Sequence, residues 1–315
     1  MMKISDHQFE QLAHLVRASS RLLLISHKKP DGDTTGATTA FARWCHNEGK
    51  DVTLYCQDKP AETFQYLFEV RNYTNDPNVF ERAYDLVIIF DSGDPKYAGV
   101  DTLLPRIKPG YTLVNIDHHQ TNQRYGDLNL VEMMSSTSEI VYRFFEVNRI
   151  KPDTEMATSL LTGICTDTSN FSNPLTSESA ILAASHLTSD GARFNEIIKF
   201  VWRNKSIESL RLWGKMLDRL KENKTYDIVS TYITNHEMQS VGCDVAEGLT
   251  NFLSGVLMDV DTVLLFKELP NRQIRGSLRS QNRDISKLAK FFGGGGHRGA
   301  AGFTVNASLK DLGIG

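Results

Sequence analysis

The sequence is poor in cysteine and contains no long apolar run. Its four cysteines form no C-x-x-C pair, and this sparse distribution is typical of a reducing compartment, so we expect a cytoplasmic protein. No apolar stretch approaches about 18 residues, so we expect no transmembrane helix and no membrane partner. The first residues, MMKISDHQFEQL, lack the apolar region and small-residue cleavage site of a signal peptide.

What is present is the composition of an ordinary globular protein. Hydrophobic residues make up 40% of the chain, which is enough for normal cores, and a length of 315 residues favours two domains over one. The sequence contains no internal repeat and no low-complexity tract.

Charge is divided unevenly along the chain. Residues 1–190 hold 17 Lys and Arg against 25 Asp and Glu, a net charge of −8, whereas residues 191–315 hold 18 against 13, a net charge of +5. An acidic half can hold cations, and a basic half can hold phosphates. Taken alone, the division favours chance variation in solvated surface charge.

The first half alternates short apolar runs with helical patterns. The runs at 21–26, 51–56, 84–90 and 111–116 predict strands, and the segments 35–49, 135–148 and 153–167 predict helices. Continuous apolar strands between helices are typical of a parallel sheet covered on both faces. We therefore predict a doubly wound α/β domain over residues 1–190.

The pattern changes in the second half. Residues 191–222 are charged and helical, which predicts a connecting linker. Beyond it, strand patterns at 226–233, 262–269, 273–280 and 302–305 and helical patterns at 245–258 and 284–292 predict a smaller α+β domain over residues 223–315.

Residues that commonly bind metals follow three of the predicted strands. They are His27, Asp31, Asp33, Asp91, Asp117, His118 and His119. Because ligands bind at the carboxyl ends of parallel strands, we expect these side chains to converge, with Asp167 completing the group from the end of a predicted helix. Taken singly, Asp-Gly-Asp is an ordinary turn and a His pair is ordinary polar packing; their joint position at strand ends favours a site.

Five carboxylates close together repel one another unless cations are present. With the imidazoles, they exceed what one tetrahedral zinc ion needs, and they suit two cations about 3.5–4 Å apart that share a carboxylate. Oxygen and imidazole ligands without thiolate favour Mn²⁺ or Mg²⁺ over structural Zn²⁺. The sequence therefore predicts two divalent cations, either Mn²⁺ or Mg²⁺.

A second concentration of unusual residues is FFGGGGHRGAAG, residues 291–302. Four glycines expose backbone amides that, with a following helix N-terminus, would cradle an anion, and His297 and Arg298 stand at the exit. The other interpretation is a flexible linker or tight turn. Upstream, a strand over 273–280 would carry Arg275, Ser277 and Arg279 on one face, which suits a phosphate or an ordinary solvated surface.

These motifs, in this order, resemble the DHH phosphoesterases. HKKPDGDTTG, FDSGD, NIDHH and GICTDTSNF are similar to the four motifs of that family, and SLRS with FFGGGGHRGAAGF is similar to its accessory domain, DHHA1. The resemblance covers nearly the whole chain and is greatest to the oligoribonuclease (nanoRNase) and pAp phosphatase subgroup. It implies a DHH domain and a smaller DHHA1 domain with a cleft between them.

The resemblance also implies roles for individual residues. His27, Asp31 and Asp91 would hold one cation, and Asp33, Asp91, His118 and Asp167 the other. Asp117 would orient a neighbouring ligand, and His119 would lie near the scissile phosphate or support the ligands. The substrate would contact residues of the second domain, chiefly Arg279 and His297, and more weakly Arg275, Ser277, Ser280, Gly295 and Arg298. Ala37 departs from the family, in which many members have a small hydroxyl residue there.

The implied activity is Mn²⁺-dependent hydrolysis of short single-stranded RNA or DNA, including linear dinucleotides such as pGpG and pApA, to mononucleotides. Hydrolysis of 3′-phosphoadenosine 5′-phosphate (pAp) to AMP and phosphate is implied as well. The alternatives are a manganese pyrophosphatase or exopolyphosphatase, a single-strand exonuclease, and a nucleotide sensor without catalysis. The sequence leaves digestion polarity open, and it is compatible with a homodimer.

Overall fold

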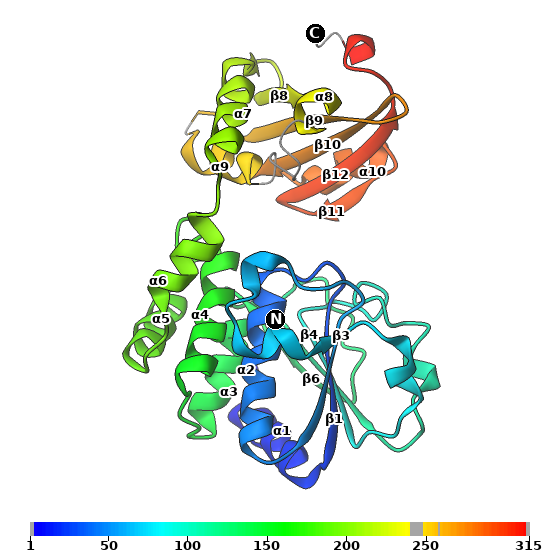
Figure 1. The fold of residues 1–315 in the computed structure, drawn as a ribbon, viewed down its shortest axis with the longest axis vertical. Coiled ribbons are helices and arrows are strands. Elements are labelled where there is room, and N and C mark those ends of the chain that lie inside the picture. The colour runs from blue at the N-terminus through cyan, green and yellow to red at the C-terminus, as the bar shows by residue number, and fades with distance from the viewer. Residues whose placement is uncertain (1–2, 240–247, 258, 313–315) are drawn as a thin grey trace. The chain divides into compact units, whose positions relative to one another are not determined.

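The chain divides into two structural units, Met1–Asn204 and Lys205–Gly315 (Figure 1). The structure is a computed structural model that describes residues 3–239, 248–257 and 259–312. The boundary falls inside the segment 191–222 that was predicted to be a linker. That segment consists of α6 (Phe194–Ile197) and the π-helix η5 (Ile198–Trp202) in the first unit and α7 (Ile207–Asp218) in the second.

The first unit is built on a six-stranded sheet in the order β3-β2-β1-β4-β5-β6, in which every neighbouring pair is parallel. Its strands are β1 (Arg21–Ser26), β2 (Asp51–Tyr55), β3 (Tyr73–Thr74), β4 (Leu86–Phe90), β5 (Thr112–Asp117) and β6 (Leu128–Val131). All of β4 and all but the first residue of β1 are buried, because both faces of the sheet are covered. The predicted parallel α/β sheet is confirmed.

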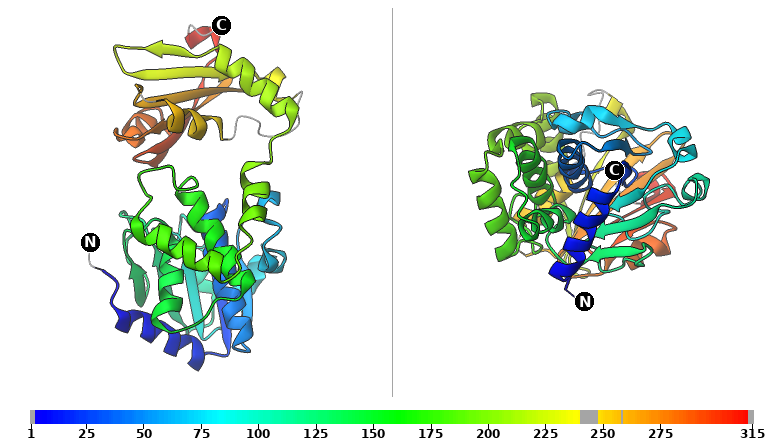
Figure 2. Two further views of the ribbon diagram at one scale, coloured as in Figure 1. Left: turned by 90° about the vertical axis from the view of Figure 1, so that its left-hand side faces the viewer. Right: turned by 90° about the horizontal axis from the view of Figure 1, so that it is seen from below.

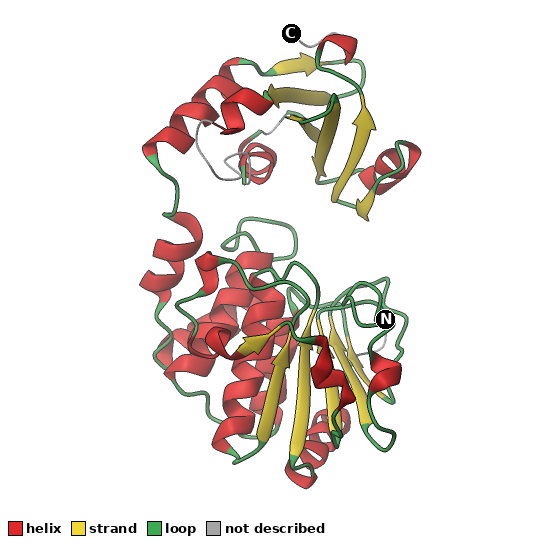
Figure 3. Cartoon of the chain, turned by 45° about the vertical axis from the view of Figure 1, so that its right-hand side comes forward, coloured by secondary structure: helices red, strands yellow, loops and turns green. Residues whose placement is uncertain are grey.

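The two faces of this sheet are covered differently (Figure 3). One face packs against α1 (Asp6–Ala18), α2 (Gly32–Asn47) and α3 (Thr137–Val147), and α4 (Thr154–Asp167) and α5 (Glu178–Ser189) pack on these helices in turn. The other face packs against turns and the 3₁₀ helices η3 (Pro77–Glu81) and η4 (Leu104–Arg106). Figure 2, seen from below, has the green helices on one side and the cyan turns on the other. Two further 3₁₀ helices are η1 (Glu62–Phe64) and η2 (Phe68–Asn72).

The three predicted helices are confirmed, although α2 begins three residues before the predicted start at residue 35, and each helix begins at a side-chain cap. Ser136 accepts a hydrogen bond from the Glu139 amide at the start of α3, and Asp153 accepts one from Met156 at the start of α4. Asp31 caps α2 by accepting from the amides of Asp33 and Thr34. Because Asp31 is this cap, α2 begins beside the end of β1, and its first turn carries Asp33.

Glycine residues lie where helices α2 and α4 pack closely against each other. A Cβ atom at Gly36 would lie 2.3 Å from the backbone oxygen of Ser159, and one at Gly32 would lie 2.4 Å from the side chain of Thr166. A Cβ at Gly163 would lie 1.9 Å from Ser138 Oγ and 2.7 Å from Asp33 Oδ1. Gly36 therefore lets the backbones of α2 and α4 come into direct contact, while Gly32 and Gly163 leave room for the side chains of Thr166, Ser138 and Asp33.

The second unit contains a sheet in the order β11-β12-β10-β9-β8-β7. The strands are β7 (Lys221–Asn223), β8 (Ile228–Ile233), β9 (Thr262–Leu269), β10 (Gln273–Ser280), β11 (Gly295–His297) and β12 (Ala300–Asn306), and only the β8–β9 pair is parallel among those described. The helical elements besides α7 are α8 (Asn235–Gln239), α9 (Leu249–Val256), α10 (Ile285–Phe291) and η6 (Lys310–Leu312). The predicted α+β pattern is confirmed; residues 245–247 and 258 of one predicted helix lie outside the described residues.

Some elements of the first unit were not predicted. Strand β3 has two residues, and β6 (LNLV) interrupts its apolar pattern with Asn129, so neither gives a clear periodic signal. Among the described residues, no helix has both the length and the apolar character needed to cross a bilayer.

The glycine contact makes a testable prediction about stability. Gly36→Ala should lower the free energy of unfolding by about 1–3 kcal/mol, because the new methyl group overlaps the backbone of α4. Gly214→Ala in α7 is the matched control: a Cβ there meets nothing within 4 Å, so it should raise stability by about 0.4–1 kcal/mol. Urea denaturation followed by fluorescence measures both; an unchanged Gly36→Ala midpoint would contradict the close contact.

Candidate metal centre

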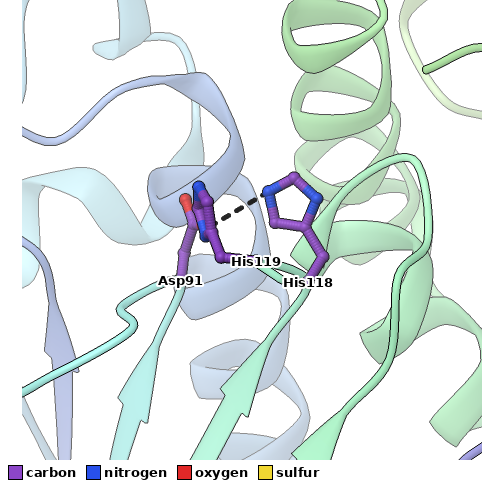
Figure 4. Close-up of side chains that lie close together, drawn as sticks. All are labelled: Asp91, His118 and His119. Carbon is purple, nitrogen blue, oxygen red and sulfur yellow. Dashed lines mark ion pairs between the residues drawn. The ribbon is translucent and has the colours of Figure 1, made fainter. Parts of the chain in front are cut away.

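The carboxyl ends of three neighbouring strands bring the predicted ligands together. His27 follows β1, Asp91 follows β4, and His118 follows β5, and these strands are adjacent in the sheet. The strand order reverses between β1 and β4, and such a switch point is where open parallel sheets bind ligands. In Figure 4, Asp91, His118 and His119 point into the same space above the strand ends.

The first group of ligand atoms belongs to His27, Asp31 and Asp91, and these atoms lie within 4.8 Å of one another. His27 Nε2 is 3.7 Å from Asp31 Oδ1 and 3.4 Å from Asp91 Oδ2. The other ring nitrogen, Nδ1, is 2.8 Å from the Lys28 carbonyl oxygen. A proton on Nδ1 donates to that carbonyl, which leaves Nε2 directed at the carboxylates.

The second group belongs to Asp33, His118 and Asp167, again within 4.8 Å. His118 Nε2 is 3.2 Å from Asp167 Oδ2 and 3.5 Å from Asp91 Oδ1, while its Nδ1 is 3.2 Å from the Met134 carbonyl oxygen. Asp33 is fully buried, and Asp167 is the last residue of α4. Both histidines thus have the same arrangement, with Nδ1 on a backbone carbonyl and Nε2 on the acids.

Asp91 contacts both groups. Its Oδ2 faces His27 and its Oδ1 faces His118, so one carboxylate lies between the two imidazoles. Its backbone has a φ of 56°, a left-handed conformation that costs energy for a residue other than glycine. Its amide donates to the Ile116 carbonyl at 2.8 Å, which holds this strained conformation against β5.

Burial and mutual repulsion change the acidities in the cluster. Burial, together with the charge of Asp91, raises the pKa of Asp33 to about 7. Burial and the charges of Asp33 and Asp31 raise the pKa of Asp167 well above its ordinary value. Burial also acts to raise the pKa of Asp91, but hydrogen bonding and attraction from His27, with attraction from His118 and His119, hold it below the ordinary value.

The donor set fits divalent cations. Four carboxylates and two imidazole nitrogens gather with no thiolate among them, which suits hard or borderline cations such as Mn²⁺ and Mg²⁺. In metal-free protein, burial and mutual repulsion favour the protonated forms of Asp33 and Asp167. Cations would replace those protons and remove the repulsion.

His119 forms a hydrogen bond with Asp117, which is not one of the predicted metal ligands. Its Nδ1 donates to Asp117 Oδ1 at 2.7 Å and is also 3.6 Å from Asp91 Oδ1. Burial acts to lower the pKa of His119, but the bond to Asp117 and the charge of Asp91 raise it to about 9. A protonated nitrogen that donates to Asp117 has no free lone pair for a cation, so Nδ1 is not a ligand in this arrangement, although Asp91, His118 and His119 also lie close enough together to hold one.

The predicted substrate residues of β10 lie as the strand pattern indicates. Arg275 is exposed, Ser277 and Arg279 are half-buried, and Ile274 and Leu278 between them are buried. Arg279 Nε donates to Asn251 Oδ1 of α9 at 2.6 Å. Ser280 is buried and its hydroxyl donates to Asp261 at 2.8 Å, so within this unit it already has a structural partner.

The glycine run is part of the second sheet. Gly295 lies in β11 with open space where a Cβ would be, while a Cβ at Gly294 or Gly296 would overlap β12. The flexible linker is therefore excluded for this segment. The expectation of a following helix N-terminus is wrong, since β11 turns into β12. Arg298 is exposed and donates to the Asn282 carbonyl, and the side chain of His297 lies outside the described residues.

Four residues that contact the predicted site residues were missed in the sequence. Asn122 donates to Asp117 Oδ2 at 2.5 Å, and Tyr97 lies with its ring centroid 5.2 Å from that of His27. Thr137 contacts Asp33 and Asp91, and Asn251 contacts Arg279. Asn122 is in the motif NIDHHQTN and Thr137 is in the cap SSTS, so both were visible but had no chemical role assigned.

The comparisons with known proteins agree with this geometry. Residues 21–164 match the model of the DHH family, N-terminal domain. The chain is 27% identical to the bifunctional oligoribonuclease and PAP phosphatase NrnA of Thermus thermophilus, covering 90% of this chain and 84% of that protein. It is 25% identical to the protein of the same name from Bacillus subtilis, covering 94% and 92%.

A solved structure shares the fold of the described chain. It is an exopolyphosphatase-related protein from Bacteroides fragilis, with a TM-score of 0.89 and 21% identity, covering 98% of this chain and 94% of that one. The family match spans the strands and helices that carry five of the six predicted ligands. The match of residues 21–164 to the DHH family, N-terminal domain, agrees with the family that the motifs indicated.

Proposed function

We propose that this chain is a metal-dependent phosphoesterase that hydrolyses short single-stranded oligonucleotides, including linear dinucleotides, to mononucleotides, and pAp to AMP and phosphate. The observation that carries the proposal is the convergence of His27, Asp33, Asp91, His118 and Asp167 at one edge of a parallel sheet. The two NrnA relatives, named for oligoribonuclease and PAP phosphatase activities, support this substrate class.

The ligand assignment follows the two groups. His27, Asp31 and Asp91 would hold one cation, and Asp33, His118, Asp167 and the shared Asp91 would hold the other. Two such cations, Mn²⁺ or Mg²⁺, supply Lewis acidity toward a phosphoryl oxygen and activate water at neutral pH. The side chains keep this charge at a fixed position, because each histidine is anchored through Nδ1 to a backbone carbonyl.

The Asp117–His119 pair supplies a proton to the reaction. Asp117 is buried and accepts from both His119 and Asn122, which fixes the imidazole ring in one orientation. Against the effect of burial, the bond to Asp117 and the charge of Asp91 raise the pKa of His119 to about 9, which favours its protonated form. It would therefore attract the substrate phosphate and protonate the leaving oxygen.

The second unit would hold the substrate through Arg279, supported by Asn251, and through Arg275, Ser277, Gly295, His297 and Arg298. A planar guanidinium fixed by a side-chain hydrogen bond suits a phosphate, since it offers two parallel donors. We also propose a cytoplasmic location and leave a homodimer as the oligomeric state to test.

The shared ligand gives the first prediction for activity. Asp91→Asn should lower kcat by more than about 100-fold, the upper end for losing a residue that only supports a ligand. Asp85→Asn is the matched control, because Asp85 precedes β4 at its other end and accepts hydrogen bonds from the Ser20 and Arg21 amides. Mononucleotide release from a dinucleotide at saturating Mn²⁺ measures both. Full turnover by Asp91→Asn would rule out a shared ligand.

The phosphate anchor gives a second prediction. Arg279→Ala should raise KM for a dinucleotide about tenfold or more with a smaller effect on kcat, because a charge-assisted contact to substrate is lost. Arg272→Ala is the control, since that side chain is 81% exposed and pairs with Asp311. Steady-state kinetics over a range of substrate concentrations separates the two constants. Equal KM values for Arg279→Ala and wild type would remove Arg279 from the anchor.

The substrate class is tested by a panel. RNAs and DNAs of two to ten nucleotides, pAp and pyrophosphate are each incubated with and without Mn²⁺, and products are separated by chromatography. We expect mononucleotides from the shortest RNAs and phosphate from pAp, both only with the metal. Release of phosphate from pyrophosphate alone would favour the pyrophosphatase alternative, and binding without turnover of any substrate would favour a sensor.

A further inference from the structure

The chain just before and at the start of α3 contacts three of the predicted metal ligands. We call residues 134–138 the entry segment. The Met134 carbonyl oxygen is 3.2 Å from His118 Nδ1. The Thr137 amide donates to Asp33 Oδ2 at 2.6 Å, and the Ser138 amide donates to Asp33 Oδ1 at 2.8 Å. Both oxygens of Asp33 are therefore held by the first amides of one helix.

Thr137 is the residue of this segment that contacts two ligands at once. Besides its amide bond to Asp33, its hydroxyl donates to Asp91 Oδ1 at 3.1 Å. The same Asp91 oxygen lies 3.5 Å from His118 Nε2. One side chain thus links the fully buried acid of α2 to the acid shared by the two ligand groups.

Residues 135–138 of the entry segment are buried and hydrogen-bonded. Ser135, Ser136, Thr137 and Ser138 have no exposed surface, and Glu139 is 1% exposed. The Ser136 hydroxyl accepts from the Glu139 amide at 3.0 Å, and the Glu139 carboxylate accepts from the amide and hydroxyl of Ser135. Because water has little access here, it could not easily replace a hydrogen bond that a substitution removed.

Electrostatics explains why such contacts matter for these acids. Asp33 and Asp91 repel each other in a buried site, and unrestrained carboxylates would rotate apart. Amides at a helix N-terminus carry partial positive charge and favour an ionised carboxylate. The hydroxyl of Thr137 adds a directional donor that occupies one lone pair of Asp91 and leaves the other directed at the ligand groups.

We propose that Thr137 is a positioning residue of the metal centre, whose amide and hydroxyl fix Asp33 and Asp91 relative to each other. Thr137 would bind no metal and no substrate; it would set the geometry of both cation positions together. The inference rests on the proposed metal-dependent function.

The test compares metal affinity in full-length, metal-free variants. Thr137→Val removes the hydroxyl and keeps the shape and the amide, and Thr137→Ser restores a hydroxyl. Thr39→Val is the matched control, because Thr39 is also buried but its hydroxyl donates to backbone carbonyls of its own helix, α2. Isothermal titration calorimetry with Mn²⁺ measures the dissociation constants, and kinetics at increasing Mn²⁺ measures KM for a dinucleotide.

Thr137→Val should bind Mn²⁺ about 10-fold to 100-fold more weakly, the range for losing a hydrogen-bond partner of a metal ligand. Thr137→Ser and Thr39→Val should stay within about twofold of wild type, a threshold chosen well below that range. At saturating Mn²⁺, KM of Thr137→Val should equal that of wild type. Circular dichroism of the metal-free proteins checks folding, and Thr137→Ala replaces Thr137→Val if the valine does not fit.

The outcomes separate the two levels of the hypothesis. Absence of Mn²⁺ and Mg²⁺ binding by wild type would overturn the proposed function, and this inference with it. If wild type binds Mn²⁺ and Thr137→Val binds equally well, the metal centre stands and the role of Thr137 is wrong. An equal loss of affinity in Thr39→Val would also overturn that role, because the effect would then be general to buried threonines.

Discussion

Repulsion between buried carboxylates is the constraint on which the rest of this structure depends. Asp33 and Asp91 have almost no contact with solvent. Asp31 lies close to His27, and Asp167 lies close to His118. Bringing such groups together costs free energy unless protons or cations neutralise them. The raised pKa of Asp33, about 7, expresses that cost. A fold that keeps these residues in place is therefore organised to receive positive charge.

The parallel sheet is what permits this arrangement. Its strands β1, β4 and β5 end side by side, so residues more than 60 positions apart in the chain become neighbours. Helices complete the group from two directions, since Asp33 lies in the first turn of α2 and α4 ends with Asp167. Among the proposed ligands, Asp91 is the residue with a left-handed backbone conformation. The strain therefore falls on the residue whose carboxylate lies between His27 and His118.

The sequence was informative where chemistry and periodicity coincide. Apolar runs in the sequence predicted the strands of the sheet, and polar residues at the ends of these runs predicted the site. Parallel topology determines where the strand ends meet. It was less informative for short elements such as β3. It also could not show that Thr137 reaches Asp91 or that Asn122 reaches Asp117, since these bonds depend on side-chain directions fixed by packing. The glycine run illustrates an ambiguous signal: four glycines permit a ligand to approach, but Gly294 and Gly296 are also needed to pack against β12.

The glycine contact between α2 and α4 has a consequence for the dimensions of the site. Gly36 brings the backbone of α2 against that of α4 at Ser159 and Gly163, and the two helices carry Asp33 and Asp167 close to this crossing. A separation defined by main-chain atoms cannot be adjusted through rotamer changes, unlike one defined by side chains. The glycine contact therefore fixes the distance between the two helices. A larger residue at one of these glycines would change the distance between Asp33 and Asp167.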